Sequence, residues 1–301
     1  MNIGYAIALQ AIYGTTLTAS KILVTFAAPI LIIGIRMTTA GCLLLAYQTM
    51  FQHKIFKINR ETWPYILQFA FFNIYLPYVL RYWSLQYLSV NKISLFLYLT
   101  PLVSYILSCL LGIQKSCYRK WTGIIISFAG FAPSLFIHNM AENASYELGF
   151  VSLAEIAMLF AILAQSYSWI IMQKIAKNHL NVTTVNGVSM LIGGIFALIT
   201  SIILNEPLTI NNPWAFSGWL AFVIIVTNII FYNAQAILLK RFSATIIALT
   251  GLCAPLVATL TSAIILREPI TWEFLFSSTF LAFGVYIFYK TEKNILPEIS
   301  K

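Results

Sequence analysis

The chain contains no aspartate, and charged residues of all kinds make up only 9% of its 301 residues. Soluble domains carry about 25% charged residues. The nine acidic residues are all glutamate, which excludes aspartate-based intramembrane proteases and pumps that are phosphorylated on aspartate. Hydrophobic residues make up 60% of the chain, and a water-soluble fold of this size cannot bury so much apolar surface. We therefore expect an integral membrane protein.

The sequence also lacks the usual signs of a catalytic or metal site. Its four cysteines show no metal-ligand or disulfide spacing. The three histidines, His53, His138 and His179, lie in loops or at the ends of apolar segments, and neither His-Glu-x-x-His nor Gly-x-Ser-x-Gly occurs. A phosphate-binding loop is absent as well. We expect no cofactor, no metal and no enzymatic activity, and a membrane-embedded enzyme is only a remote alternative.

Ten apolar segments fill the chain, each near the roughly 20 residues that a helix needs to cross the hydrocarbon. They are predicted at residues 3–22, 30–50, 63–85, 92–113, 121–138, 149–173, 184–204, 216–238, 244–266 and 272–289. The predicted fold is an all-α integral membrane protein with ten transmembrane helices. The first apolar run has no basic segment before it, so we expect it to be retained as a membrane helix.

The positive charges of the loops alternate along the chain. Thirteen lysines and arginines fall on one predicted side of the membrane, and only Lys21, Lys92 and Arg267 fall on the other. The positive-inside rule places the first set, and both termini, in the cytoplasm. We expect the cytoplasmic (inner) membrane as the location. The net charge of +9 therefore does not indicate nucleic acid, and the expected partners are the lipid bilayer and a small-molecule solute.

The second half of the chain repeats the first at an offset of 154 residues. Without a gap, this shift places Tyr78 on Tyr232, Ser89 on Ser243, Pro101 on Pro255 and Gly130 on Gly284. The repeats are predicted at residues 1–138 and 149–290, followed by a short cytoplasmic tail at 291–301. Because each copy has five spans, the second must enter the membrane with the opposite topology, an arrangement typical of secondary transporters.

Both repeats place a proline within a predicted span. A proline there frees a backbone carbonyl. Pro101 and Pro255 are therefore predicted helix kinks, either at a transport site or in helix packing alone.

Several short motifs carry a family resemblance across all ten spans. They are Tyr13-Gly14, Lys21, Arg36, Tyr87-Leu88-Ser89 and Pro101 in the first half, and Ser243-Ala244-Thr245, Pro255, Leu266-Arg267-Glu268-Pro269 and Gly284 in the second. With these motifs the chain resembles an EamA-type member of the drug/metabolite transporter superfamily. Gln114 departs from the glutamate that is usual in the family. The resemblance implies transport of amino acids, nucleotide-like metabolites or drugs.

Polar and aromatic side chains are predicted to line a cavity between the third and eighth spans. At helical spacing, the third span carries Phe71, Tyr75, Tyr78 and Tyr82, with Arg81 one turn from Tyr78, and the eighth span carries Asn228, Tyr232 and Gln235. The offset pairs Tyr78 with Tyr232 and Arg81 with Gln235. Tyrosines suit a ring-bearing or zwitterionic solute, and arginine suits a carboxylate or phosphate. Helix packing, or extension of Arg81 to the interface, is the alternative interpretation.

Glu155 is the only carboxylate well inside a predicted span. Burying a charge in a bilayer costs roughly 2.5–3.5 kcal/mol on insertion scales, so we expect Glu155 to pair with Arg81, with Arg36 or with the solute. Arg36 itself is assigned a structural role. Tyr13 and Tyr98 are further candidate solute contacts, and Gln10, Gln165, Ser166 and Trp169 are weaker ones.

Together these features predict a secondary transporter. It would move a small polar metabolite, an amino acid or a nucleotide-like solute, across the cytoplasmic membrane by alternating access, with the solute bound between the repeats. A multidrug or toxic-compound exporter of the same fold is the alternative. A membrane scaffold or sensor is disfavoured because all connections between spans are short.

Overall fold

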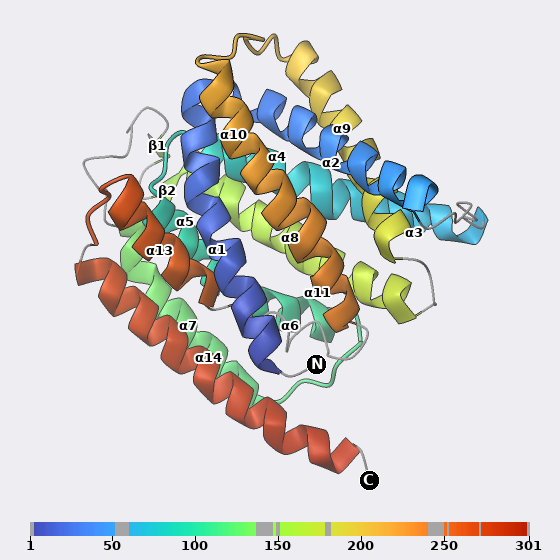
Figure 1. Ribbon diagram of the computed structural model, residues 1–301. Helices are drawn as coiled ribbons and strands as arrows, with labels where there is room; N and C mark the ends of the chain where they lie inside the picture. Colours follow the sequence, from blue (N-terminus) through green and yellow to red (C-terminus); the bar gives the residue numbers. More distant parts are fainter. Residues whose placement is uncertain are drawn as a thin grey trace.

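The structure, a computed structural model, describes residues 3–51, 60–136, 147–148, 151–177, 182–239, 250–251, 253–270 and 272–299. The described chain is almost entirely helical (Figure 1). Its β-structure is one antiparallel pair of two-residue strands, β1 (Glu147–Leu148) and β2 (Val151–Ser152). The expectation of an all-α protein is met apart from this short pair.

Several predicted spans of the first half consist of more than one helical element. Its elements are α1 (Ile3–Phe26), α2 (Pro29–Phe51), the 3-10 turn η1 (Arg60–Thr62), α3 (Trp63–Phe69), the π-helix η2 (Ala70–Tyr75), α4 (Leu76–Ser84), α5 (Val90–Tyr98), α6 (Thr100–Leu110) and α7 (Tyr118–Phe136). The fourth span is interrupted at Leu99, and Pro101 lies in the first turn of α6, where a missing N–H costs little.

The second half follows a similar order. Its elements are α8 (Leu153–Lys177), α9 (Val182–Ile203), α10 (Pro213–Val223), the π-helix η3 (Ile224–Phe231), α11 (Tyr232–Leu239), α13 (Cys253–Ile265) and α14 (Trp272–Ile299). Pro255 lies in the first turn of α13. Residues 244–249 and 252 of the predicted ninth span, and all three histidines, lie outside the described residues.

Length and hydropathy identify membrane spans among these helices. Within the described ranges, six segments are long and apolar enough to cross a bilayer: Gly4–Val24, Pro29–Met50, Val90–Leu110, Leu153–Ile175, Thr183–Ile203 and Pro213–Gln235. Large apolar side chains such as Trp214 and Ile264 lie exposed on the outside of the helices. Contiguous exposed apolar surface is not stable in water, and the chain is a multi-pass membrane protein.

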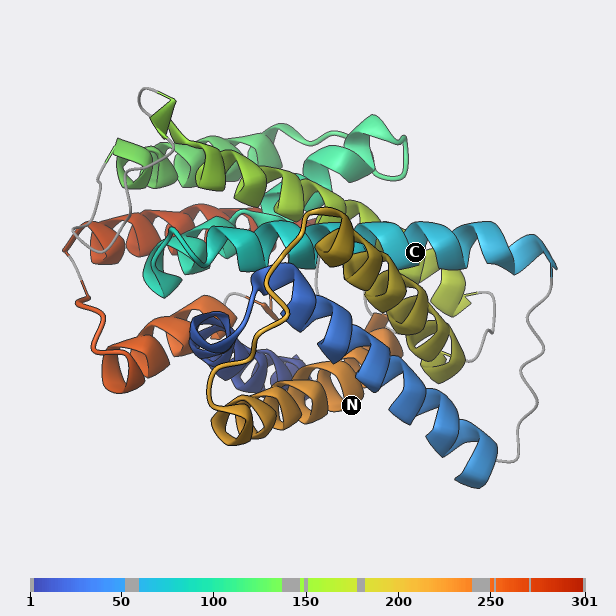
Figure 2. The same cartoon turned by 90° about the horizontal axis from the view of Figure 1, so that it is seen from above.

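The helices pack in pairs that are distant in sequence. α2 packs against α9, α7 against α14, α1 against α13, and α6 against α8. α7 and α14 lie side by side along one edge of the bundle (Figure 1), and the view turned by 90° agrees (Figure 2). The start of α1 and the end of α14 lie toward the same end of the bundle (Figure 1).

Two π-helical segments change the register of the third and eighth spans. η2 begins at Ala70 and η3 at Ile224. A π turn adds one residue to a helical turn and so rotates the following residues to another face. Pro77 in the first turn of α4 lacks an N–H and favours such an interruption.

One predicted site residue makes a different contact from the others in its stripe. Tyr78 bonds to Tyr232, and Tyr75, the last residue of η2, does not join that pair. The Tyr75 hydroxyl instead forms a 2.7 Å hydrogen bond with Thr200 Oγ1 on α9, and its ring meets that of Phe196 edge-on. Tyr75 is therefore a contact between η2 and α9.

Glycines allow α7 and α14 to approach closely. A Cβ atom on Gly284 would lie 2.2 Å from Ser127 Oγ and 2.5 Å from the carbonyl oxygen of Gly123, and a Cβ on Gly130 would lie 2.2 Å from Phe280 Cβ. Small residues at such contacts are typical of helix association in membranes.

We expect Gly284→Ala to destabilise the protein by about 1–3 kcal/mol, the usual cost of overpacking a tight contact. Gly218→Ala is the matched control, because a Cβ there meets no atom within 4 Å and alanine favours a helix by roughly 0.5–1 kcal/mol over glycine. Unfolding in detergent measures both. Equal stability of the two variants would contradict the close packing of α7 on α14.

Candidate functional site

Two arginines are buried in the interior of the bundle. Arg36 on α2 is 1% exposed and Arg81 on α4 is 2% exposed. Among the described residues, no carboxylate forms an ion pair with either guanidinium. Because a buried charge without a counter-charge is costly in a membrane, such residues are functional candidates by default.

Arg36 is held by one residue from each half of the chain. Its Nε donates to Asn228 Oδ1 on η3 at 2.9 Å, and its Nη1 donates to the Tyr82 hydroxyl at 2.9 Å. Its guanidinium carbon lies 4.8 Å from the centre of the Tyr78 ring, within cation–π range. Nη2 of Arg36 has no hydrogen-bond partner.

Arg81 approaches the same tyrosine. Its guanidinium carbon lies 5.2 Å from the centre of the Tyr78 ring. Its Nη1 donates to the Tyr13 hydroxyl at 3.0 Å, and its Nη2 donates to Gln165 Oε1 at 3.4 Å. The Nε of Arg81 is buried without a partner. Tyr78 thus contacts two cations, and its ring partly offsets the cost of burying them.

The tyrosines paired by the 154-residue offset meet directly. The Tyr232 hydroxyl donates to the Tyr78 hydroxyl at 2.8 Å. Both residues lie on the first helix that follows a π-helical segment, Tyr78 on α4 after η2 and Tyr232 on α11 after η3. π-Helical segments occur frequently at functional sites, and here each one sets the direction of a central tyrosine.

A small cavity lies beside this cluster. It has about 50 Å³ of space for water, which accommodates a few water molecules. Its polar and aromatic lining consists of Gln10, Tyr13, Arg81, Thr100, Gln165, Trp169, Phe231, Tyr232 and Gln235, and Pro255 also contributes. The Tyr13 and Phe231 rings are stacked, with centres 4.2 Å apart.

The structure brings most of the predicted site residues together. Tyr13, Arg81, Tyr232 and Gln235 line the cavity. Tyr78 and Asn228 contact residues of the cluster without lining it. Tyr98 is buried in the hydrophobic core. The sequence reasoning missed Phe231, which carries no polar group, and placed Arg36 outside the site although an arginine inside a span was the available signal.

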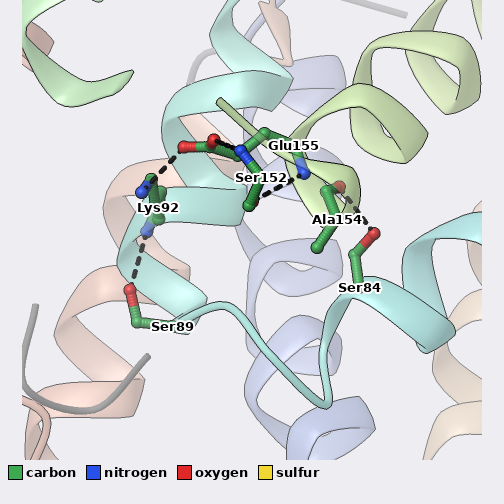
Figure 3. A network of polar contacts seen from close by, with 6 residues as sticks. All are labelled: Ser84, Ser89, Lys92, Ser152, Ala154 and Glu155. Atoms are coloured by element: carbon green, nitrogen blue, oxygen red, sulfur yellow. Dashed lines mark hydrogen bonds and ion pairs between the residues drawn. The ribbon is translucent and has the colours of Figure 1, made fainter. Parts of the chain in front are cut away.

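Glu155 lies elsewhere, and its predicted pairing with an arginine is wrong. Its Oε1 forms an ion pair with Lys92 Nζ at 2.8 Å (Figure 3). The Glu155 and Lys92 side chains are 0% and 4% exposed. Its Oε2 accepts from the backbone N–H of Ser152 at 2.6 Å, while Ser152 Oγ accepts from the N–H of Glu155 at 3.3 Å. This is a capping box at the start of α8. The sequence did not suggest Lys92 as the partner, because Lys92 stands at the predicted edge of a span with the loop charges, whereas in the structure it lies inside α5.

Other charged side chains cap helix ends near the predicted outer surface. Glu206 accepts from the backbone N–H of Leu31 at the start of α2 at 3.0 Å. Glu268 accepts from the N–H of Val90 at the start of α5 at 3.1 Å. Lys21 Nζ donates to the Leu88 carbonyl, just beyond the end of α4, at 2.9 Å. Each charge has the sign that its helix terminus favours.

A multi-helix membrane protein with a central cluster of buried polar residues has the architecture of a membrane transporter. The profile of the EamA-like transporter family matches residues 1–135 and again residues 152–290. The chain belongs to this family.

Characterised and uncharacterised transporters are similar along nearly the whole chain. The S-adenosylmethionine/S-adenosylhomocysteine transporter of Chlamydia muridarum is 27% identical over 288 residues, covering 93% of this chain and 89% of the relative. The transporter of the same name from Chlamydia trachomatis serovar L2 is 25% identical over 287 residues, covering 93% and 86%. The uncharacterized transporter YvbV of Bacillus subtilis is 27% identical over 271 residues, covering 89% and 84%.

A solved crystal structure has the same fold. It superposes with a TM-score of 0.68 at 15% identity and covers 97% of this chain and 99% of its own.

Proposed function

We propose that the protein is a secondary transporter built from two inverted five-helix repeats, residues 1–138 and 149–290, with a cytoplasmic tail at 291–301. The two separate family matches support this division. The π-helices that begin at Ala70 and Ile224 support it too, because they differ by the same 154 residues as Tyr78 and Tyr232. Helix packing is also consistent with this division. The first span of the first repeat (α1) packs on the fourth span of the second (α13), and the first span of the second repeat (α8) packs on the fourth span of the first (α6).

The proposed orientation places both termini in the cytoplasm and the protein in the cytoplasmic membrane. The asymmetry of the loop charges supports the cytoplasmic side. The start of α1 and the end of α14 lie toward one end of the bundle (Figure 1), which is consistent with both termini on the same side. A reporter fused after Lys301 should score cytoplasmic, and a reporter in the loop near Asn143, outside the described residues, should score external. The reverse pattern would contradict this orientation.

The central cavity is the proposed solute site. Tyr13, Arg81, Tyr232 and Gln235 would contact the solute, with Tyr78 and Asn228 supporting them. Ligand sites for drug-sized molecules measure roughly 300–1,000 Å³, so a cavity of about 50 Å³ corresponds to a closed state. Helix breaks beside Pro101 and Pro255 are the proposed hinges that widen it during alternating access.

The proposed cargo is a small polar metabolite. The relatives named as S-adenosylmethionine/S-adenosylhomocysteine transporters favour a solute that joins an amino acid to a nucleoside. The observation that carries the proposal is the pair of buried arginines beside an aromatic cavity, because guanidinium groups bind carboxylates and aromatic faces stack on rings. A multidrug exporter of the same fold is the alternative, and catalysis is not part of the proposal.

Uptake by proteoliposomes tests the proposed function. Vesicles with the purified protein should accumulate radiolabelled S-adenosylmethionine or S-adenosylhomocysteine above empty vesicles, and unlabelled solute should compete. A cysteine at position 232, which lines the cavity, should react with small aqueous thiol reagents and be protected by the solute. Transport of lipophilic cations, with no uptake of either metabolite, would favour the exporter.

A further inference from the structure

Two buried polar atoms of the cavity lining have no hydrogen-bond partner, and both are donors. They are Arg81 Nε and Gln235 Nε2. Nη2 of Arg36, which contacts the Tyr78 ring, also has no hydrogen-bond partner. A buried donor without a partner is costly, so these N–H groups are suited to a ligand that brings acceptors.

The same lining carries no negative charge. Among the described residues that line the cavity there is no glutamate, while Arg81 supplies a full positive charge and Arg36 adds a second one next to the Tyr78 ring. The buried carboxylate of Glu155 instead forms an ion pair with Lys92 and accepts the backbone N–H of Ser152 in the α8 capping box. An ammonium or sulfonium group entering the cavity therefore meets no carboxylate there.

Aromatic faces are the remaining partners for a cation. Tyr13, Trp169, Phe231 and Tyr232 all line the cavity. The face of an aromatic ring attracts a cation, most strongly in tryptophan.

We propose that the cavity selects its solute by a carboxylate, bound by the Arg81 guanidinium and the Gln235 amide, and holds any cationic group of that solute against aromatic faces. This inference rests on the proposed transport function and specifies its solute class. The solutes are zwitterions with a carboxylate at one end and an aromatic ring or a cationic group at the other. Solutes that share the ring and the amine but lack the carboxylate should bind more weakly.

Matched solute pairs test the carboxylate. S-adenosylhomocysteine is compared with its decarboxylated amine, and phenylalanine with phenethylamine, as labelled tracers and as competitors in proteoliposomes. The carboxylated member of a transported pair should bind about 10–100 times more tightly, as expected for a hydrogen bond to a charged group. Arg81→Gln, which copies the residue at the paired position 235, should abolish this preference, and Arg81→Lys should retain part of it.

Arg267→Gln is the matched control, because Arg267 is exposed at the end of the bundle, and it should leave the preference unchanged. If wild-type protein takes up none of the four tracers, the transport proposal and this inference both fail for these solutes. If transport occurs but decarboxylated solutes bind equally well, or if Arg81→Gln weakens both members of a pair alike, only the inference is overturned.

A second comparison tests the aromatic partner. S-adenosylmethionine and S-adenosylhomocysteine differ by the methyl group that makes the sulfur a cation. Trp169→Leu should weaken binding of the sulfonium solute about 2–30 times more than binding of the thioether, the range expected for a cation–π contact. Equal losses for the two solutes would refute this part of the proposal.

Discussion

Replacing Glu155 with glutamine is expected to lower the free energy of unfolding by roughly 3–5 kcal/mol, the usual result when one member of a buried ion pair is removed. The carboxylate lies 2.8 Å from Lys92 Nζ, and both side chains are almost fully buried. Glutamine can also serve as the N3 residue of a capping box. The loss of stability therefore reports the missing charge and not a broken helix cap.

The double variant Lys92→Met, Glu155→Gln should recover most of this stability. A buried ion pair can often be replaced by uncharged residues of similar volume without a net loss. Glu268→Gln is the matched control: this carboxylate accepts from the backbone N–H of Val90, and an amide oxygen can accept the same bond. Unfolding in detergent gives the comparison, and a double variant no more stable than Glu155→Gln would contradict a pairwise interaction.

Within the described residues, the sequence alone predicted where the helices lie, because the length of an apolar run is a strong signal in membrane proteins. It also brought Tyr78 and Tyr232 together through the internal offset, and the structure places their hydroxyl groups 2.8 Å apart. Arg81 could be identified because a charge inside an apolar span is rare.

What the sequence could not give is the direction of side chains beyond an irregular helix. A period of 3.6 residues grouped Tyr75 with Tyr78, but the Tyr75 hydroxyl bonds to Thr200 on α9, whereas the Tyr78 hydroxyl bonds to Tyr232. Pro77 was a local signal for the irregular segment η2. The offset places Phe231 at the corresponding position of the second repeat, so no such proline marks η3. The partner of Glu155 was also beyond reach, since Lys92 lies on another helix and its burial depends on tertiary packing.

Arg36 is expected to act on the solute through the charge that it places behind Tyr78, without lining the cavity itself. Its guanidinium carbon lies 4.8 Å from the Tyr78 ring centre, and two of its nitrogens are fixed by Asn228 and Tyr82. In general, two unit charges about 10 Å apart interact by roughly 1–2 kcal/mol at an effective dielectric constant of about 20, the size of effect expected from a charge that neighbours the solute site without touching the solute. We therefore expect Arg36→Gln to weaken binding of a carboxylated solute about tenfold.

A purely structural role for Arg36 predicts a different pattern of losses. If Arg36 only holds Asn228 and Tyr82 in place, Arg36→Gln should weaken S-adenosylhomocysteine and 5′-methylthioadenosine, which lacks the amino-acid end, by the same factor. If its charge acts on the carboxylate, the loss should be confined to S-adenosylhomocysteine, and Arg36→Lys should restore part of the difference because it keeps the charge while losing the planar geometry of the guanidinium. Equilibrium binding of both solutes to wild type, the two Arg36 variants and Arg267→Gln distinguishes the two roles. Equal losses of affinity for both solutes would show that Arg36 has a structural role and that Arg81 alone is the charge that recognises the solute.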